Sequence, residues 1–255
     1  MYKIQPNTLF TGKTIKYMPV CHSTNDIAAE IIQSGNNVFE GMVIITDNQT
    51  AGRGQRGNVW EASVGENLTF SLILKPNFLK ASEQFKLNVA VSLGVLDCLS
   101  EYIDDDLKVK WSNDIYFQNQ KMGGILIENT LQGYQIGFSV IGIGLNINQT
   151  QFPVPNATSL RNVTTNPLKY DLSDLLSELL ACIEKNYLAV KNGDYEVLKE
   201  RYLSNLFRIN EFHHFKKNGQ LFLGKIVGID ESGQLGIESD GLVEYYGFQE
   251  VAFVI

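Results

Sequence analysis

The last part of this chain has a different pattern from everything before it, and this change constrains the fold more than any other feature. From Phe212 onward, short apolar runs are separated by residue pairs typical of tight turns between antiparallel strands: Asn218-Gly219, Ser232-Gly233 and Asp240-Gly241. About 45 residues of such hairpins predict a small β-barrel. We therefore expect two units, residues 1–206 and residues 207–255.

The first unit contains segments of both helical and strand character, in runs rather than in strict alternation. Apolar residues recur at helical spacing in residues 82–103, 195–204, 21–35 and 171–190, and Asp171 is placed to cap the last of these helices. Strands are predicted at 41–47, 67–76, 107–111, 114–118, 121–129 and 134–148, and a proline-containing loop at 152–160. This mixture predicts an α+β fold in which helices pack on a mixed β-sheet.

The composition excludes several classes of protein. A net charge of −7 argues against a chain-wide affinity for nucleic acid or for an anionic membrane. Cys21, Cys98 and Cys182 are too far apart in sequence for a zinc motif or a disulfide framework, which fits a reducing compartment. Because no apolar run reaches about 18 residues, we expect no membrane span and a soluble cytoplasmic protein.

One glycine-rich stretch combines flexibility with positive charge. It contains Gly52, Arg53, Gly54, Gln55, Arg56 and Gly57 and ends at Trp60. Glycines let a backbone approach a ligand closely, and arginine pairs well with carboxylate or phosphate, so the loop could wrap an anion. A solvated surface loop explains the same residues equally well. The loop lacks the lysine of a Walker motif, and its formal match to a dinucleotide fingerprint lacks the βαβ context.

Polar residues also stand at the ends of the short strands between residues 108 and 129. Lys110, Asn113, Asp114 and Lys121 occupy such positions, where a scaffold commonly displays working groups. Lys121 could neutralise charge on a phosphoryl or carboxyl group, and Asp114 could orient an amine, accept a proton or hold a metal. The alternatives are a simple turn and a solvated lysine in a hairpin.

Two further segments have both a structural and a functional interpretation. Ser23, Thr24 or Asn25 can cap the helix at 21–35, and the same side chains could hydrogen-bond a small polar ligand at the helix start. Gly142 and Gly144 lie in a predicted strand and indicate that some other group approaches the backbone closely. No metal-ligand spacing and no nucleophilic triad can be assembled from the remaining residues.

Taken together, these segments resemble the biotin–protein ligases, which attach biotin to the carrier subunit of acetyl-CoA carboxylase. The resemblance covers nearly the whole chain, including the final barrel, which is similar to the SH3-like domain of that family. It is carried in order by the residues at 23–25 (STN), 49–60 (QTAGRGQRGNVW), 110–116 (KWSNDIY), 121–128 (KMGGILIE) and 142–148 (GIGLNIN).

The resemblance implies a two-step reaction and a set of site residues. Biotin and ATP form biotinyl-5′-AMP, with Mg²⁺ accompanying ATP, and a carrier lysine then accepts the biotinyl group. Catalytic roles are implied for Arg53, Lys121 and Asp114. Biotin contacts are implied for Ser23, Thr24, Asn25, Gln49, Gly52, Arg53, Gly54, Gln55, Lys121, Gly123 and Gly124. Nucleotide contacts are implied for Arg56, Trp60, Lys110, Asn113 and Asn146.

The sequence departs from the family pattern at three points. Gln55 stands where many members have arginine, which puts a phosphate contact in doubt, and Ser112 stands where many have proline. The STN segment begins at residue 23, which leaves no room for the DNA-binding domain of some members, so we expect an enzyme and not a repressor. Alternatives are a lipoate or octanoate transferase of the same fold, although its Arg-Arg-x-Ser-Gly-Gly-Gly loop is absent, and a binding module without turnover. The family also implies a possible homodimer.

Overall fold

The main unit is built on a mixed seven-stranded sheet. The computed structural model describes residues 4–35, 38–103 and 106–254. The strands follow the order β1-β2-β3-β7-β6-β5-β4, and β1 is parallel to β2 while every other neighbouring pair is antiparallel. Their bounds are β1 Ile15–Cys21, β2 Val43–Gln49, β3 Leu68–Leu74, β4 Leu107–Lys110, β5 Asp114–Phe117, β6 Gln120–Gln132 and β7 Gln135–Leu145.

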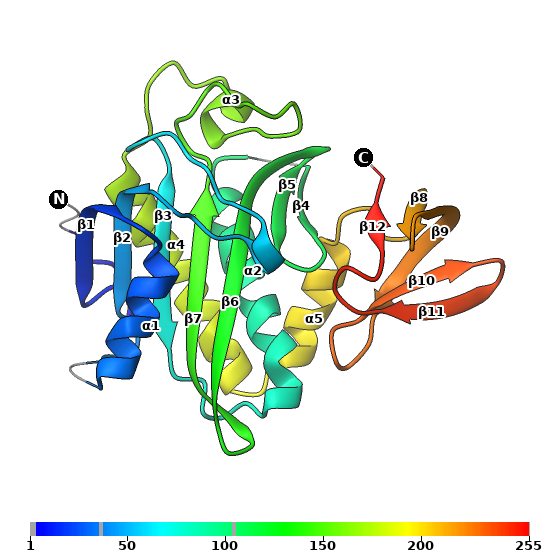
Figure 1. The fold of residues 1–255 in the computed structure, drawn as a ribbon, viewed down its shortest axis with the longest axis horizontal. Coiled ribbons are helices and arrows are strands. Elements are labelled where there is room, and N and C mark those ends of the chain that lie inside the picture. Colours follow the sequence, from blue (N-terminus) through cyan, green and yellow to red (C-terminus); the bar gives the residue numbers. More distant parts are fainter. Residues whose placement is uncertain (1–3, 36–37, 104–105, 255) are drawn as a thin grey trace.

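Helices cover both faces of this sheet. One face carries α2 (Gln84–Leu99), α4 (Leu172–Lys191) and α5 (Tyr195–Ser204), and the other carries α1 (Thr24–Ser34), as Figure 1 shows. Strand β2 contributes side chains to the hydrophobic cores on both faces of the sheet. Val43 and Ile45 belong to the large core under α2 and α4, whereas Ile44 belongs to a smaller cluster under α1. Successive side chains of a strand point to opposite faces, so one β-branched run supplies both cores.

Short helices lie in the connections. The 3₁₀ helices η1 (Gln55–Gly57) and η2 (Ala81–Glu83) and the short helix α3 (Leu160–Thr164) are placed in this way. Within the described residues no helix is long and apolar enough to cross a membrane.

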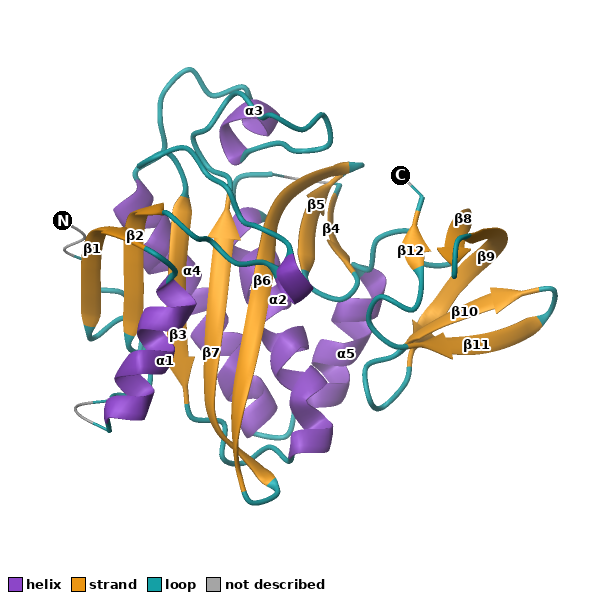
Figure 2. Cartoon of the chain, in the orientation of Figure 1, coloured by secondary structure: helices purple, strands orange, loops and turns teal. Residues whose placement is uncertain are grey.

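The C-terminal unit is a five-stranded antiparallel sheet beside β4 and β5 (Figure 2). Its strands follow the order β11-β10-β9-β8-β12. Both residues of the predicted turns Asn218-Gly219 and Asp240-Gly241 have a positive φ. At the third predicted turn, Gly233 alone has a positive φ, and its N–H donates to Asp230 O. The strand bounds are β8 Phe212–Lys217, β9 Gln220–Ile229, β10 Leu235–Ser239, β11 Leu242–Tyr246 and β12 Ala252–Phe253.

The α+β class is confirmed, and the differences from prediction are local. Helix α4 is capped by Asp171, whose carboxylate accepts the N–H groups of Ser173 and Asp174 as expected. Strand β1 was not predicted, and it lies at the edge of the sheet with a mixed burial pattern. An edge strand with one weakly buried face gives little alternation for a sequence pattern to detect. Helix α3, at five residues, is also too short for periodicity to show.

Candidate active site

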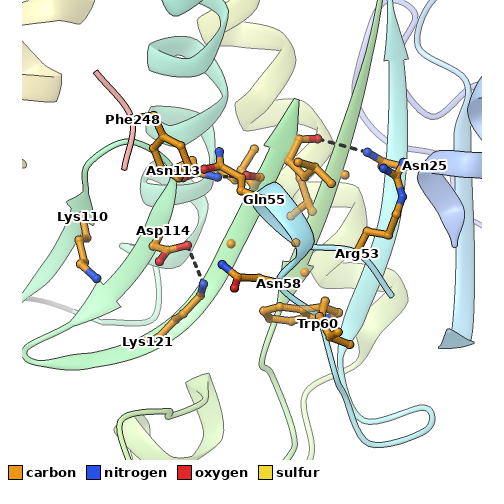
Figure 3. Close-up of a pocket in the computed structure, with 18 of the residues that line it drawn as sticks. Asn25, Arg53, Gln55, Asn58, Trp60, Lys110, Asn113, Asp114, Lys121 and Phe248 are labelled. Carbon is orange, nitrogen blue, oxygen red and sulfur yellow. Dashed lines mark hydrogen bonds and ion pairs between the residues drawn. The ribbon is translucent and has the colours of Figure 1, made fainter. Parts of the chain in front are cut away.

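A cavity of about 400 Å³ lies on the face of the sheet that carries α1, since Ser23, Thr24 and Asn25 at the start of that helix line it. The glycine-rich loop, strands β6 and β7 and the segment 248–253 of the C-terminal unit line it (Figure 3). The cavity brings together most of the residues singled out from the sequence, and the arginine loop and Lys121 share it. The predicted residues that line it are Ser23, Thr24, Asn25, Gln49, Arg53, Gly54, Gln55, Trp60, Lys110, Asn113, Asp114, Lys121 and Gly124.

The start of α1 supplies the neutral polar end of the cavity. Ser23 is the N-cap residue by its backbone, but its side chain makes no capping hydrogen bond. Capping therefore does not account for this side chain, which lines the cavity instead. The backbone N–H of Thr24 donates to Gln49 Oε1 at 2.7 Å, and the Thr24 hydroxyl lies 3.2 Å from the same oxygen. Ser71 Oγ lies 2.8 Å from Thr24 Oγ1 and 2.6 Å from Asn25 Oδ1.

The glycine-rich loop closes on itself as a tight turn. The N–H of Gly54 donates to Asn58 O at 2.7 Å, and that of Trp60 donates to Gly52 O at 3.0 Å. A Cβ on Gly52 would overlap the carbonyl of Trp60, so this turn needs glycine there. Gln55 Oε1 and Trp60 Nε1 are buried and have no hydrogen-bond partner among the described residues. The side chain of Arg56, a predicted nucleotide contact, lies outside what the structure describes.

Two glycines of β7, Gly142 and Gly144, are approached by cavity side chains of this protein. A Cβ on Gly142 would overlap the amide of Asn25, and a Cβ on Gly144 would overlap the indole of Trp60. The close approach predicted from the sequence is therefore made by two cavity residues. The side chains of Asn25 and Trp60 lie directly against the backbone of β7, because the glycines at positions 142 and 144 have no side chains.

Strands β4 to β6 supply the charged end of the cavity. Lys121 Nζ and Asp114 Oδ1 form an ion pair at 2.7 Å, above Gly124, where a larger residue would meet both groups. Lys110 Nζ lies 4.9 Å from the centre of the Tyr116 ring and 5.2 Å from that of Phe253. Burial lowers the pKa of Lys110, an effect that the nearby Asp114 carboxylate opposes, and burial raises the pKa of Tyr116 to about 12.

Three predicted site residues do not line the cavity. Gly52 packs within the loop, and Gly123 packs against Leu145. Asn146 donates from its side-chain nitrogen to the carbonyl of Thr158 at 3.1 Å. The backbone of Lys121 binds the same loop, since its N–H donates to Asn156 O and its carbonyl accepts from Thr158 N–H. Asn146 thus holds the 149–160 loop against the site.

Sequence reasoning missed several residues of the site. Glu128 and Asp26 both contact Arg53 through their carboxylates, and the buried Ser71 links Thr24 to Asn25. The C-terminal unit brings Phe248 and Phe253 to the rim. Glu128 ends the motif at residues 121–128, but the motif does not show its contact with Arg53, because each of these residues acts through partners that are distant in sequence.

Comparison with known proteins identifies the family of this chain. Residues 17–146, about half of the chain, match the model described as the biotin/lipoate A/B protein ligase family. The chain belongs to this family. It is 31% identical over 242 residues to the bifunctional ligase/repressor BirA of Bacillus subtilis, with 92% of this chain and 73% of that protein covered. It is 28% identical over 237 residues to the biotin–[acetyl-CoA-carboxylase] ligase of Mycobacterium tuberculosis, covering 90% of this chain and 86% of that protein.

Solved structures of family members have the same fold. The biotin protein ligase from Aquifex aeolicus in complex with biotin and ATP matches with a TM-score of 0.78 and 26% identity, over 95% of this chain and 99% of that one. A mutant of the same enzyme in complex with biotin gives the same TM-score and identity. The structural similarity therefore extends beyond residues 17–146, which the family model matches, to 95% of the chain.

Proposed function

We propose that this protein is a biotin–protein ligase, which activates biotin as biotinyl-5′-AMP and transfers the biotinyl group to a lysine of a carrier protein. The single observation that carries the proposal is one cavity with a neutral hydrogen-bonding end and a cationic end, in a chain of this ligase family. The relatives named above are biotin ligases, which favours biotin over lipoate as the acyl group.

The neutral end suits the ureido ring of biotin. A ureido group has one carbonyl acceptor and two N–H donors, and the hydroxyls of Ser23 and Thr24 and the amide of Gln49 can complement both kinds of group. Trp60 forms an apolar wall for the rest of the ligand. The buried indole N–H of Trp60 has no hydrogen-bond partner among the described residues, so a ligand oxygen that reached it would satisfy it.

The cationic end suits the first step. A carboxylate oxygen of biotin attacks the α-phosphorus of ATP, a new P–O bond forms, and the bond to the pyrophosphate leaving group breaks. Negative charge spreads over the carboxyl–phosphate junction during this step. Lys121 and Lys110 are fixed where they can stabilise that charge.

Asp114 suits the second step. A lysine amine in water has a pKa near 10.4, so the carrier lysine must lose a proton before it can attack. The Asp114 carboxylate can orient this amine and receive the proton. The amine then bonds to the carboxyl carbon, the C–O bond to the phosphate breaks, and AMP leaves.

Magnesium enters this scheme with ATP. Among the described residues no group of three or more His, Cys, Asp or Glu side chains is placed to hold a metal. This agrees with the usual mode of Mg²⁺, which binds one or two carboxylates together with substrate phosphates. Asp114 is the carboxylate that lines the cavity and could supply such a contact.

We place the reaction in the cytoplasm and propose that two copies of the chain can pair. The cysteines are free thiols, which fits a reducing compartment. Strand β1 ends the seven-stranded sheet and has an exposed edge that a second copy could extend. Light scattering of the purified protein distinguishes a monomer from a dimer.

The activity is tested directly with the wild-type protein. We expect incubation with biotin, Mg-ATP and a biotin carboxyl carrier domain to raise the mass of the carrier by one biotinyl group on a single lysine. A folded protein that binds biotin but yields neither biotinyl-5′-AMP nor biotinylated carrier would contradict the proposal.

Lys121→Ala tests the cationic end. Loss of the ammonium should lower the rate of biotinyl-5′-AMP formation by about 100-fold or more, because no other group replaces its contact with the developing charge. Lys225→Ala is the matched control, since Lys225 on β9 is also paired with a carboxylate at 2.8 Å, that of Glu238 on β10, away from the cavity. Equal rates of adenylate formation in the two variants would refute the role of Lys121.

A further inference from the structure

The guanidinium of Arg53 is already paired with two carboxylates. Its Nη1 donates to Glu128 Oε1 at 2.9 Å and its Nη2 to Glu128 Oε2 at 2.7 Å, a bidentate contact. The same Nη2 also lies 2.7 Å from Asp26 Oδ1. Hydrogen bonding to Glu128 raises the pKa of Arg53, so the guanidinium is charged at any working pH. One positive charge thus faces two negative charges.

This charge balance disfavours a third anion at Arg53. A biotin carboxylate or a phosphate would have to displace one of the two carboxylates or bear their repulsion. Lys121 differs, because its ion pair with Asp114 is neutral as a unit. Figure 3 shows Arg53 beside Asn25, at the other end of the cavity from Lys121 and Asp114. The geometry gives Arg53 a tethering role between the loop, β6 and α1.

Glu128 also fixes the orientation of Asn25. Asn25 Nδ2 donates to Glu128 Oε2 at 2.7 Å. An ionised carboxylate only accepts hydrogen bonds, so it must face the NH₂ group of Asn25 and cannot face its oxygen. Asn25 Oδ1 is thereby directed to Ser71, which in turn contacts Thr24. One carboxylate therefore sets the donor and acceptor directions of a chain of side chains that ends at the neutral part of the cavity.

We propose that Glu128 is a positioning residue of the ligase, which holds Asn25 and Arg53 and so keeps the biotin end of the cavity in its binding geometry. This inference rests on the proposed function and adds a residue to it. Glu128 acts through the two side chains that it holds and takes no part in the chemical steps.

The exposure of the Arg53 and Glu128 side chains allows a positioning role to be distinguished from a role in folding stability. Those of Arg53 and Glu128 are 40% and 41% exposed. Ion pairs this exposed contribute little to folding, so loss of the pair should leave the melting temperature within about 3 °C of wild type. An effect on biotin binding without an effect on melting is then the mark of a positioning role.

Glu128→Gln is the decisive variant, measured by calorimetric titration with biotin alone and by steady-state kinetics. We expect the Kd for biotin to rise by about tenfold or more, because the bidentate contact is lost and Asn25 loses the charged acceptor of its NH₂ group, keeping only the longer contact with Leu126 O. The KM for ATP should stay within about twofold, because the cationic end is unchanged. Glu128→Asp keeps the charge on a shorter side chain and should recover part of the affinity.

Two comparisons complete the test. Glu238→Gln is the control, since Glu238 forms a partly exposed ion pair with Lys225 away from the cavity, and it should bind biotin as the wild type does. If Glu128→Gln does not fold, Asp26→Asn replaces it as the variant that loosens Arg53. In that case a rise of about threefold in the Kd for biotin supports the inference, and no rise contradicts it.

Other outcomes overturn the inference. Glu128→Gln with a wild-type Kd for biotin would do so, as would an equal weakening of biotin and ATP with a melting temperature lowered by more than about 5 °C. These results test only the role of Glu128, because the proposed function is tested separately by the activity of the wild-type enzyme. A wild-type protein without ligase activity would instead contradict the proposed function.

Discussion

At the scale of single residues, the cavity depends on two positions of β7 that have no side chain, Gly142 and Gly144. Asn25 and Trp60 occupy the space that side chains at Gly142 and Gly144 would need. The cavity thus gains two walls that rest directly on backbone. A strand glycine usually weakens a sheet, and here the benefit to the cavity explains its presence.

Gly144→Ala tests whether the position of Trp60 depends on the absence of a side chain at residue 144. The added methyl group would overlap the Trp60 ring, so the ring must move and the apolar wall must shift. We expect the KM for biotin to rise by about tenfold or more, with stability lowered by about 1–3 kcal/mol. Steady-state kinetics and urea unfolding measure the two effects.

Gly137→Ala on the same strand is the control. Its methyl group would come within 3.2 Å of Gln132 Cβ at the exposed end of the β6–β7 hairpin, away from the cavity. A similar KM for both variants would show that Trp60 does not depend on Gly144.

At the scale of elements, α4 serves as an anchor for the N-terminal segment. The buried carboxylate of Glu184 accepts the backbone N–H groups of Leu9, Phe10 and Thr11, and the hydroxyl of Thr11 donates to Leu180 O at 3.2 Å. The segment that precedes β1 is therefore fixed by a helix more than 150 residues away in the chain.

Glu184→Gln should weaken this anchor. An amide has one oxygen in place of two, and its NH₂ group must face at least one of the three donors, which is left unsatisfied in a buried place. We expect the free energy of unfolding to fall by about 2–3 kcal/mol in urea titration. Glu200→Gln, at an exposed position of α5, should change it by less than about 0.5 kcal/mol. Equal stability of the two variants would contradict the anchoring role.

At the scale of the whole molecule, the C-terminal unit forms part of the candidate active site. Phe248 and Phe253 reach the rim of the cavity. The two units are joined by the indole N–H of Trp111, which donates to Gly233 O at 2.9 Å, and by contact between the backbone of Gly233 and the ring of Phe85 on α2. We propose that residues 1–206 and 207–255 are two units of the fold and that catalysis requires both together.

Gly233→Ala tests this requirement. A methyl group at Gly233 would overlap the Phe85 ring and push the sheet away from α2. We expect kcat/KM to fall by about tenfold or more while the circular dichroism spectrum is retained, and proteolysis between the units to become faster.

Gly241→Ala controls for backbone strain in this experiment. Gly241 has a φ of 77° against 88° for Gly233, but it has open space around it at the β10–β11 turn. The two substitutions carry similar strain, and only the first meets the other unit. Equal activity in both variants would show that docking of the two units is not needed.

The sequence by itself determined the parts that depend on neighbours in the chain. Asp171 marks the start of α4, and Asn218-Gly219 marks the β8–β9 turn, because capping and turn formation act over two to four residues. The α+β class followed from the periodicity of longer segments. The motifs indicated the ligase family, and most of the site residues predicted from them line the cavity.

The tertiary structure alone decided how those residues are used. Nothing local reveals that Arg53 meets Glu128, that Glu184 holds residues 9–11, or that Phe248 reaches the cavity. Strand β1 also became visible only through its pairing with β2. The physical reason is that a charge or a buried donor is satisfied by whichever group lies nearest in space. That neighbour is set by the packing of distant elements and not by the order of the chain.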